Sequence, residues 1–119
     1  MSDDEMPTRE PVIKGWHAHI YFEPATRERA LKLRERIARE LGLMVGSVHD
    51  KPVGPHTEPM FQVIIPVEDV GRAVPWFALN RDQLNVLLHP STGNGRADHT
   101  KHALWMGKVL PVNDAAFRS

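Results

Sequence analysis

An α+β fold with one antiparallel sheet is predicted by two patterns in this 119-residue sequence. Short stretches with apolar side chains at every second position are typical of strands that bury one face. Longer stretches with apolar residues at helical spacing lie between them. The order is strand, helix, strand, strand, helix, strand, which is the split βαβ arrangement of the ferredoxin-like fold, with the sheet in spatial order 4-1-3-2 and both helices on one face.

The first predicted strand, residues 16–22, carries two kinds of side chain in alternation. Because successive side chains in a strand point to opposite faces, one set enters the core and the other lies on the open face of the sheet. The expected core set is Ala18, Ile20 and Phe22, and the expected open-face set is His17, His19 and Tyr21.

A helix is predicted to follow over residues 27–41, where apolar residues recur at helical spacing between charged ones. Thr26 is expected to cap its start, and Gly42 is expected to end it. Residues 43–49 then predict the second strand.

Residues 50–59 contain three prolines and predict a loop before the most apolar strand, residues 60–67. The second helix is expected over residues 70–80, where Pro75 predicts a break or a restart. Residues 83–89 predict the fourth strand, after which a turn-rich loop leads to the C-terminal part of the chain.

The length predicts a single domain, because 119 residues bury one hydrophobic core but not two. Residues 1–15 are polar and show no periodicity, so we expect a flexible lead-in. The domain is expected to span residues 16–112, and residues 113–119 form a C-terminal tail.

Composition excludes several classes of function. Fifteen Lys and Arg balance fifteen Asp and Glu, so no general positive field attracts nucleic acid or an anionic membrane. The absence of cysteine excludes disulfides, thiolate zinc sites, iron–sulfur clusters and cysteine nucleophiles. With no apolar run long enough to span a bilayer and no signal-like N-terminus, we expect a soluble, cytoplasmic protein.

Seven histidines are the most unusual feature of the composition. Imidazole is the commonest metal ligand, and it exchanges protons near neutral pH. With strand 1 taken as parallel to strand 3 and antiparallel to strand 4, six histidines meet at one end of the sheet and the seventh lies one pleat further in. They are His17, His49, His56, His89, His99 and His102, with His19 as the seventh.

Two of these histidines form a pattern that is typical of a metal site. His17 and His19 lie on the same face of one strand, although exposed strand histidines show the same spacing. His89, expected beside His17 on the neighbouring strand, favours the metal interpretation. The open face would otherwise be half apolar and bare, so either the C-terminal tail or a second subunit must cover it. We favour a homodimer formed through that face.

Asp98 and His56 can each be interpreted in two ways. Asp98 and His102 would lie one helical turn apart, so Asp98 either orients His102 as a base or caps a helix. His56 follows Gly54 and Pro55 in a loop, and taken alone it is more typical of a surface residue than of a ligand.

Four segments occur in a specific order and at specific spacings: residues 16–22, residues 54–56, residues 89–93 and residues 98–107. Together they resemble the DOPA 4,5-dioxygenase family. The resemblance implies a ferredoxin-like fold, in agreement with the strand order, and extradiol cleavage of L-DOPA or a related catechol by O2. Thr57 departs from the family, which usually has proline after this histidine.

The resemblance also implies a non-haem iron(II) site, which usually consists of two histidines and one carboxylate on one face. Proton transfer to and from the catechol suits groups that titrate near neutral pH. The expected metal ligands are His17, His19 and His89, with Asp98 as a variant ligand; the expected proton-transfer groups are His56 and His102; the expected substrate contacts are His49, His99 and Tyr21.

Two alternatives stay open at this point. The chain could be a small dimeric metal-binding or ligand-binding protein of the same fold that lacks ring-cleaving activity. Zinc could also occupy the site in a purified sample, because it binds more tightly than iron(II) to nitrogen ligands.

Overall fold

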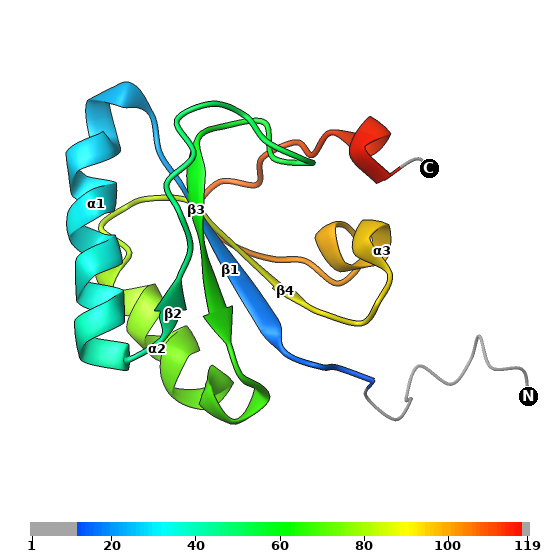
Figure 1. Ribbon diagram of the computed structural model, residues 1–119, viewed down its shortest axis with the longest axis horizontal. Coiled ribbons are helices and arrows are strands. Elements are labelled where there is room, and N and C mark those ends of the chain that lie inside the picture. The colour runs from blue at the N-terminus through cyan, green and yellow to red at the C-terminus, as the bar shows by residue number, and fades with distance from the viewer. Residues whose placement is uncertain (1–11, 118–119) are drawn as a thin grey trace, which may run out of the picture.

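The structure, a computed structural model, describes residues 12–117. One five-stranded sheet lies between two helices on one side and loops, a short helix and the C-terminal segment on the other (Figure 1). The elements are β1 (Trp16–Tyr21), α1 (Arg27–Arg36), β2 (Met44–Val45), β3 (Met60–Ile65), α2 (Val70–Asn80), β4 (Val86–Pro90), α3 (Gly95–His99) and β5 (Leu104–Met106).

The α+β class is confirmed, and the strand order is β2-β3-β1-β4-β5. Its first four strands have the predicted order, and β5 extends the sheet beyond β4. The expectation that strand 1 is parallel to strand 3 is wrong, because β1 is antiparallel to both β3 and β4. The crossover through α1 returns β2 in the direction of β1, and β3 then reverses between them.

The second strand is much shorter than predicted. Only Met44 and Val45 pair regularly with β3. Three further backbone bonds follow, from Gly46 N to Gln62 O at 2.7 Å, from His49 N to Met60 O at 2.9 Å and from Met60 N to His49 O at 3.1 Å. The chain therefore leaves the sheet edge only after the bridge between His49 and Met60, where the loop that leads to β3 begins.

The helix boundaries follow local chemistry. Thr26 does not cap α1 through its side chain; its hydroxyl instead accepts from Glu23 N at 2.9 Å within a preceding 3-10 turn. A π-helical turn after α1 ends at Gly42, whose φ of 66° suits glycine. The predicted break at Pro75 is wrong, because α2 is continuous. Pro75 and Gly71 are exposed there, so solvent can reach the carbonyl that Pro75 leaves without a donor.

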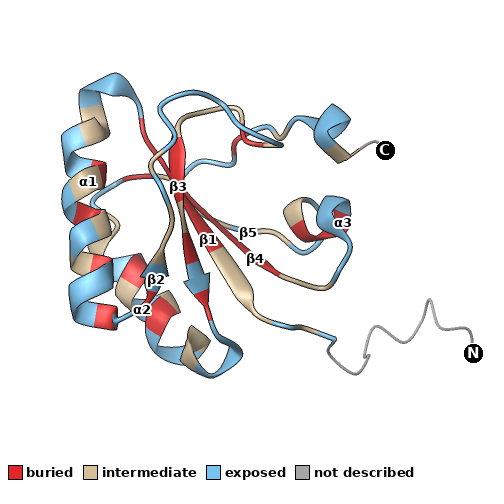
Figure 2. Cartoon of the chain, in the orientation of Figure 1, coloured by how far each residue is buried: buried red, intermediate tan, exposed pale blue. Residues whose placement is uncertain are grey.

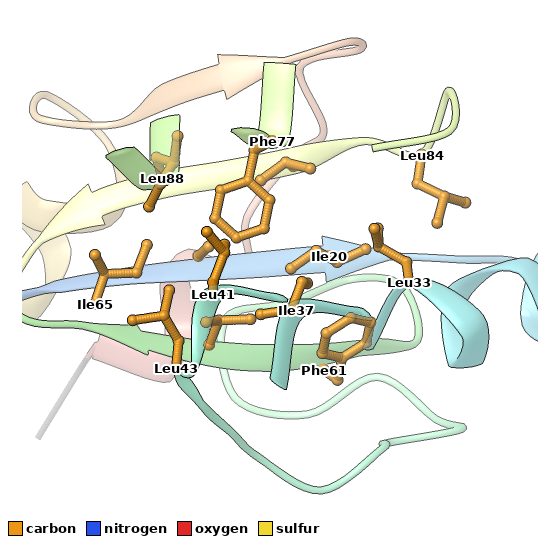
Figure 3. Close-up of a cluster of buried hydrophobic side chains, with 14 of the residues drawn as sticks. Ile20, Leu33, Ile37, Leu41, Leu43, Phe61, Ile65, Phe77, Leu84 and Leu88 are labelled. Atoms are coloured by element: carbon orange, nitrogen blue, oxygen red, sulfur yellow. The ribbon is translucent and has the colours of Figure 1, made fainter. Parts of the chain in front are cut away.

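The main core lies between the sheet and the two helices (Figures 2 and 3). Ala18 and Ile20 of β1 enter it as predicted, and Phe61 from β3 and Phe77 from α2 are fully buried against them. Burial of these apolar side chains is the main source of folding free energy, and it fixes which face of β1 looks toward the helices.

The chain covers much of the opposite face of the sheet itself. A second apolar cluster joins Tyr21, Met60 and Leu87 of the sheet to Leu110. The covering segments are tied together, since Thr57 donates to Pro111 O at 2.9 Å and Asn113 N donates to Pro55 O at 2.7 Å. The homodimer expected through this face stays a prediction.

The termini lie partly outside the described residues. Of the predicted lead-in, residues 1–11 lie outside them, as do residues 118–119 of the predicted tail. Lys14 N donates to Ser91 O at 2.9 Å and Ser91 N donates to Gly15 O at 2.8 Å, so the β1–β4 pairing extends past the strand ends. In residues 12–117, no helix is long and apolar enough to cross a membrane.

Shortening a side chain of α2 should lower the stability of the protein at a buried position but not at an exposed one. Phe77→Ala should lower the free energy of unfolding by about 3–5 kcal/mol, because it removes a fully buried ring and leaves a cavity. Leu79→Ala is the matched control, since Leu79 lies on the same helix and is 86% exposed. Urea unfolding followed by circular dichroism measures both values, and equal losses for the two variants would contradict the assigned core.

Candidate metal centre

Five histidines gather on the face of the sheet that points away from α1 and α2. His17 and His19 come from β1 and His89 from β4, while His56 comes from the loop before β3 and His99 from the end of α3. Their rings pack against one another, with centroid separations from 4.1 to 6.0 Å. We call these five residues the histidine cluster.

The strand register brings the first three rings together. His17 lies opposite His89 in the antiparallel β1–β4 pair, and its ring centroid is 5.2 Å from that of His89. His19 is two residues further along the same face, and its Nε2 lies 3.0 Å from Nε2 of His89. Adjacent strands hold these positions, so the three rings are placed by the sheet itself.

The other two rings arrive on covering segments. The ring centroid of His56 lies 4.1 Å from that of His19, and the ring centroid of His99 lies 4.1 Å from that of His89. α3 begins where the side chain of Asn94 accepts from Ala97 N at 3.1 Å, a regular N-cap. His56 comes from the loop before β3, which folds over the sheet and brings the ring to the cluster. The sequence analysis had placed His56 at one end of the sheet instead.

Two groups of three histidines could each hold a metal ion. One consists of His17, His19 and His89, and the other consists of His19, His56 and His99. In each group, one nitrogen atom of every ring lies within 4.8 Å of the others. His19 belongs to both groups and is the centre of the cluster.

Backbone carbonyls select the nitrogen that two of the rings present to the cluster. Nδ1 of His89 lies 2.8 Å from Pro90 O, and Nδ1 of His99 lies 2.7 Å from Gly95 O. A carbonyl only accepts, so Nδ1 carries the proton in both rings. In the neutral form, Nε2 then keeps its lone pair and is the atom able to bind a metal.

His19 has a buried nitrogen without a partner. The residue is 2% exposed, and its Nδ1 makes no hydrogen bond with any described residue. Because buried polar atoms are nearly always paired, such an atom indicates a ligand that completes the site. A set of buried imidazole nitrogens fits a divalent first-row metal, for which they are ordinary ligands.

Burial keeps the cluster neutral. Loss of hydration, reinforced by repulsion from neighbouring histidines, lowers the pKa of His56 and of His89 to about 4. The same two causes lower the pKa of His17 and hold the pKa of His19 well below its usual value. Neutral imidazole is the form that binds metal, so the cluster is ready to do so near pH 7.

Asp98 is buried, but its carboxylate is already used. Its Oδ1 accepts from the Thr92 hydroxyl at 2.6 Å, and its Oδ2 accepts from Thr92 N at 2.9 Å. Neither predicted role is seen: Asn94, not Asp98, caps α3, and the carboxylate makes no hydrogen bond with His102. The charge still lies close enough to favour protonation of His17 and His89, against the larger effect of burial.

Three residues predicted to contact substrate or transfer protons lie elsewhere or are already engaged. His49 and His102 are exposed and belong to neither group of three. Tyr21 is buried, and its hydroxyl lies 2.8 Å from Nδ1 of His56. Its ring stacks on Trp105 with 5.7 Å between centroids. Tyr21 therefore holds the His56 ring in place through a hydroxyl group that is itself fixed by this stacking.

Thr92 and Trp105 were missed by the sequence analysis. Thr92 was treated as part of a turn, although a hydroxyl six residues before a buried aspartate is a suitable partner for it. Trp105 lies in the apolar run 103–106, which is a usable signal for the fifth strand that the sequence analysis did not predict.

The sequence profile of the Dopa 4,5-dioxygenase family matches residues 16–116. The chain belongs to this family. The match includes every member of the histidine cluster as well as the covering segments that hold His56 and His99 in place.

Individual relatives agree with that assignment. The chain is 33% identical over 110 residues to DOPA 4,5-dioxygenase of Amanita muscaria, which covers 85% of this chain and 48% of the relative. It is 35% identical over 120 residues to an uncharacterized 21.2 kDa protein of Botryotinia fuckeliana, covering 87% of this chain and 66% of the relative. The chain thus spans about half of the first of these two proteins and about two thirds of the second.

A solved structure has the same fold over nearly its whole length. It is the crystal structure, at 1.46 Å resolution, of a Nostoc punctiforme protein assigned as a dioxygenase. The two chains are 38% identical and superpose with a TM-score of 0.87, which covers 91% of this chain and 96% of the other.

The buried histidines should make the metal-free protein sensitive to acid. The unfolded chain binds protons near pH 6.5, whereas folded His56 and His89 resist protonation until about pH 4. The free energy of unfolding should therefore fall as the pH drops from 6.5 to 4, by up to about 3 kcal/mol for each histidine. Urea titrations at several pH values measure this slope, and His56→Gln should reduce it. A flat profile across this window would contradict the burial of the cluster.

Proposed function

We propose that the protein is a non-haem iron(II) dioxygenase that opens the ring of L-DOPA or a related catechol beside its two hydroxyl groups. The observation that carries this proposal is the buried, neutral histidine cluster around an unpartnered nitrogen of His19. Membership of the Dopa 4,5-dioxygenase family supports the same reaction class.

His17, His19 and His89 are the proposed iron ligands. They come from two adjacent strands, so their positions depend on sheet register and not on a loop. His17 is only half-buried, which leaves one side of the group accessible to a substrate. An iron(II) ion held by these three residues would supply the Lewis acidity and the redox chemistry that a catechol and dioxygen need in order to react.

Asp98 acts in this proposal from outside the ligand set. Because both of its oxygens accept hydrogen bonds from Thr92, it supplies a fixed negative charge near His17 and His89. A site with three neutral histidines and an iron(II) ion keeps its full positive charge, which Asp98 partly balances. This arrangement differs from the usual set of two histidines and one carboxylate.

His56 is the proposed proton-transfer group. Its ring lies against that of His19, and its Nδ1 is held by the Tyr21 hydroxyl, so one nitrogen remains to face the substrate. As a neutral imidazole it can accept the proton of a catechol hydroxyl, and its pKa of about 4 in the metal-free protein makes it a weaker base than a histidine that titrates near neutral pH. His99 is proposed to contact the substrate, because it is half-exposed at the edge of the cluster.

The overall reaction balances without another reagent. One carbon–carbon bond of the ring breaks next to a hydroxyl-bearing carbon, and both oxygen atoms of O2 enter the product. One new end is an aldehyde and the other is a carboxylic acid. The four electrons that reduce O2 come from the cleaved substrate.

A metal-binding protein without ring-cleaving activity is the second candidate. One observation favours it. Asp98 is the only buried carboxylate among the described residues, and its hydrogen bonds to Thr92 keep it out of the ligand set that is usual for such an enzyme. Turnover separates the two candidates.

The direct test adds iron(II) without oxygen, then L-DOPA, then air. A yellow semialdehyde absorbance should appear. His19→Ala should lower metal affinity by at least about 100-fold and remove turnover, because His19 belongs to both possible ligand groups. Gln62→Ala is the matched control, since Gln62 lies opposite His19 on β3 and belongs to neither group. Tight metal binding with no product from any catechol would contradict the enzyme and favour the second candidate.

Removal of one hydroxyl tests the role of His56. Tyr21→Phe keeps the ring that stacks on Trp105 but removes the group that holds Nδ1 of His56. We expect kcat to fall about tenfold while metal affinity stays unchanged, as is typical when a supporting hydrogen bond is lost. Steady-state kinetics with a parallel metal titration measure this separation. An unchanged kcat would remove Tyr21 and His56 from the proposed proton path.

A further inference from the structure

Four aromatic rings lie in contact, one after another, between the histidine cluster and the edge strand β5. The ring centroid of His19 is 4.1 Å from that of His56, and the His56 centroid is 5.7 Å from that of Tyr21. The Tyr21 ring in turn stacks on Trp105, with 5.7 Å between the centroids and 24° between the ring planes. A continuous chain of rings therefore connects the buried centre of the cluster with the last strand of the sheet.

The strand register places Trp105 on the same face of the sheet as the cluster. Trp105 lies opposite Leu87 in the β4–β5 pair, and Leu87 lies opposite His19 in the β1–β4 pair. Side chains of directly paired residues point to the same face. Leu87 is fully buried between the two strands and contains only saturated carbon, so it is not readily oxidised. The aromatic route passes beside it, through His56 and Tyr21.

The Tyr21 hydroxyl is arranged for the loss of an electron together with a proton. Its oxygen lies 2.8 Å from Nδ1 of His56, which is its only hydrogen-bond partner among the described residues. The O–H bond therefore points to Nδ1, because a neutral imidazole nitrogen without a proton is an acceptor. An oxidised phenol is a strong acid, and the nitrogen that takes its proton is already at hydrogen-bond distance. Oxidation of Tyr21 thus requires no movement of the chain.

Trp105 connects this pair with solvent. It is half-buried on a strand that forms the edge of the sheet. The other two tryptophans, Trp16 and Trp76, pack against the main core on the helix side, and neither has a ring contact with Tyr21 or the cluster among the described residues. The chain has one tyrosine and no cysteine. The phenol of Tyr21 and the indole of Trp105 are therefore the groups beside the cluster that most readily lose a single electron.

We propose that Tyr21 and Trp105 form a one-electron path that carries oxidising equivalents from the histidine cluster to the protein surface. Its protective role rests on the proposed function. Hydrogen peroxide that reaches an iron(II) site without catechol leaves iron(III), hydroxide and a hydroxyl radical, a one-electron oxidant that otherwise attacks the histidines. The path itself rests on the ring contacts alone and does not depend on ring cleavage.

The electrons and protons balance at each step. The hydroxyl radical takes an electron from Tyr21 and becomes hydroxide, while the phenol proton moves to Nδ1 of His56. Trp105 then gives an electron to the tyrosyl radical, the proton returns from His56 to the Tyr21 oxygen, and the indole proton passes to water. A soluble ene-diol reductant such as ascorbate gives the indolyl radical an electron and a proton. Both side chains are then restored, and the ene-diol leaves as its own radical.

Photochemical oxidation of the full-length protein with zinc added tests the path without a redox-active metal. A flash-generated ruthenium(III) tris-bipyridine oxidises accessible indoles but cannot contact Tyr21, which is 2% exposed. In the wild type, a tyrosyl radical should follow the indolyl radical in transient absorbance and in electron paramagnetic resonance. The single tyrosine makes its signal unambiguous. Trp105→Phe keeps a ring to stack on Tyr21 but should lose most of the tyrosyl signal.

Trp76→Phe is the matched control. Trp76 is also half-buried, but it lies on α2 against the main core, so this variant should keep the tyrosyl signal of the wild type. Two results would overturn the path: a tyrosyl yield in Trp105→Phe equal to that of the wild type, or no tyrosyl radical in the wild type.

A pulse of hydrogen peroxide on the iron(II)-loaded protein, without catechol, tests the protective role. Mass spectrometry of its peptides measures the oxygen added to the cluster histidines. Trp105→Phe should show more oxidised histidine than the wild type and Trp76→Phe, and equal oxidation in all three would overturn the protective role. If no catechol is cleaved, the proposed function fails, and the flash experiment still decides whether the path exists.

Discussion

The alternation of side chains along β1 is the constraint on which the rest of the structure depends. One strand supplies Ala18 and Ile20 to the main core and His17 and His19 to the opposite face. Because the apolar set must pack against the helices, the histidines are forced onto the other face whatever their own preference. A shift of register by one residue would exchange the two faces and destroy core and metal centre together.

Burial of the histidines costs free energy that a bound cation would recover. Several imidazoles lose hydration in one place, and Nδ1 of His19 is left without a partner. A ligand that binds only the folded chain stabilises it, so metal binding and folding are coupled here. The same burial keeps the rings neutral, which is the protonation state that binds metal. Tyr21, Trp105 and Asp98 then hold the surroundings of these rings in fixed positions.

The sequence predicted the faces of the sheet better than its directions. A period of two determines side-chain parity locally, so the pairing of His17 and His19 with His89 could be anticipated. Whether neighbouring strands run parallel depends on the whole connection between them. The predicted parallel orientation of β1 and β3 was wrong for this reason. His49 lies at the end of the sheet away from His17 for that reason, in a bridge to Met60, which pairs with Tyr21. His56 reaches the cluster only because its loop folds over the sheet and is tied to residues 111–113. Such long-range ties of loops have no periodic signal in a sequence.

The central claim is that one metal ion binds within the histidine cluster with His19 among its ligands. Diffraction at the metal's absorption edge, on crystals grown with iron(II) or zinc, locates the ion directly. The account predicts an ion about 2.0–2.1 Å from a nitrogen of His19, with His17 and His89 completing the group. An ion held by exposed histidines such as His49 or His102, with the His19 ring unligated, would contradict it.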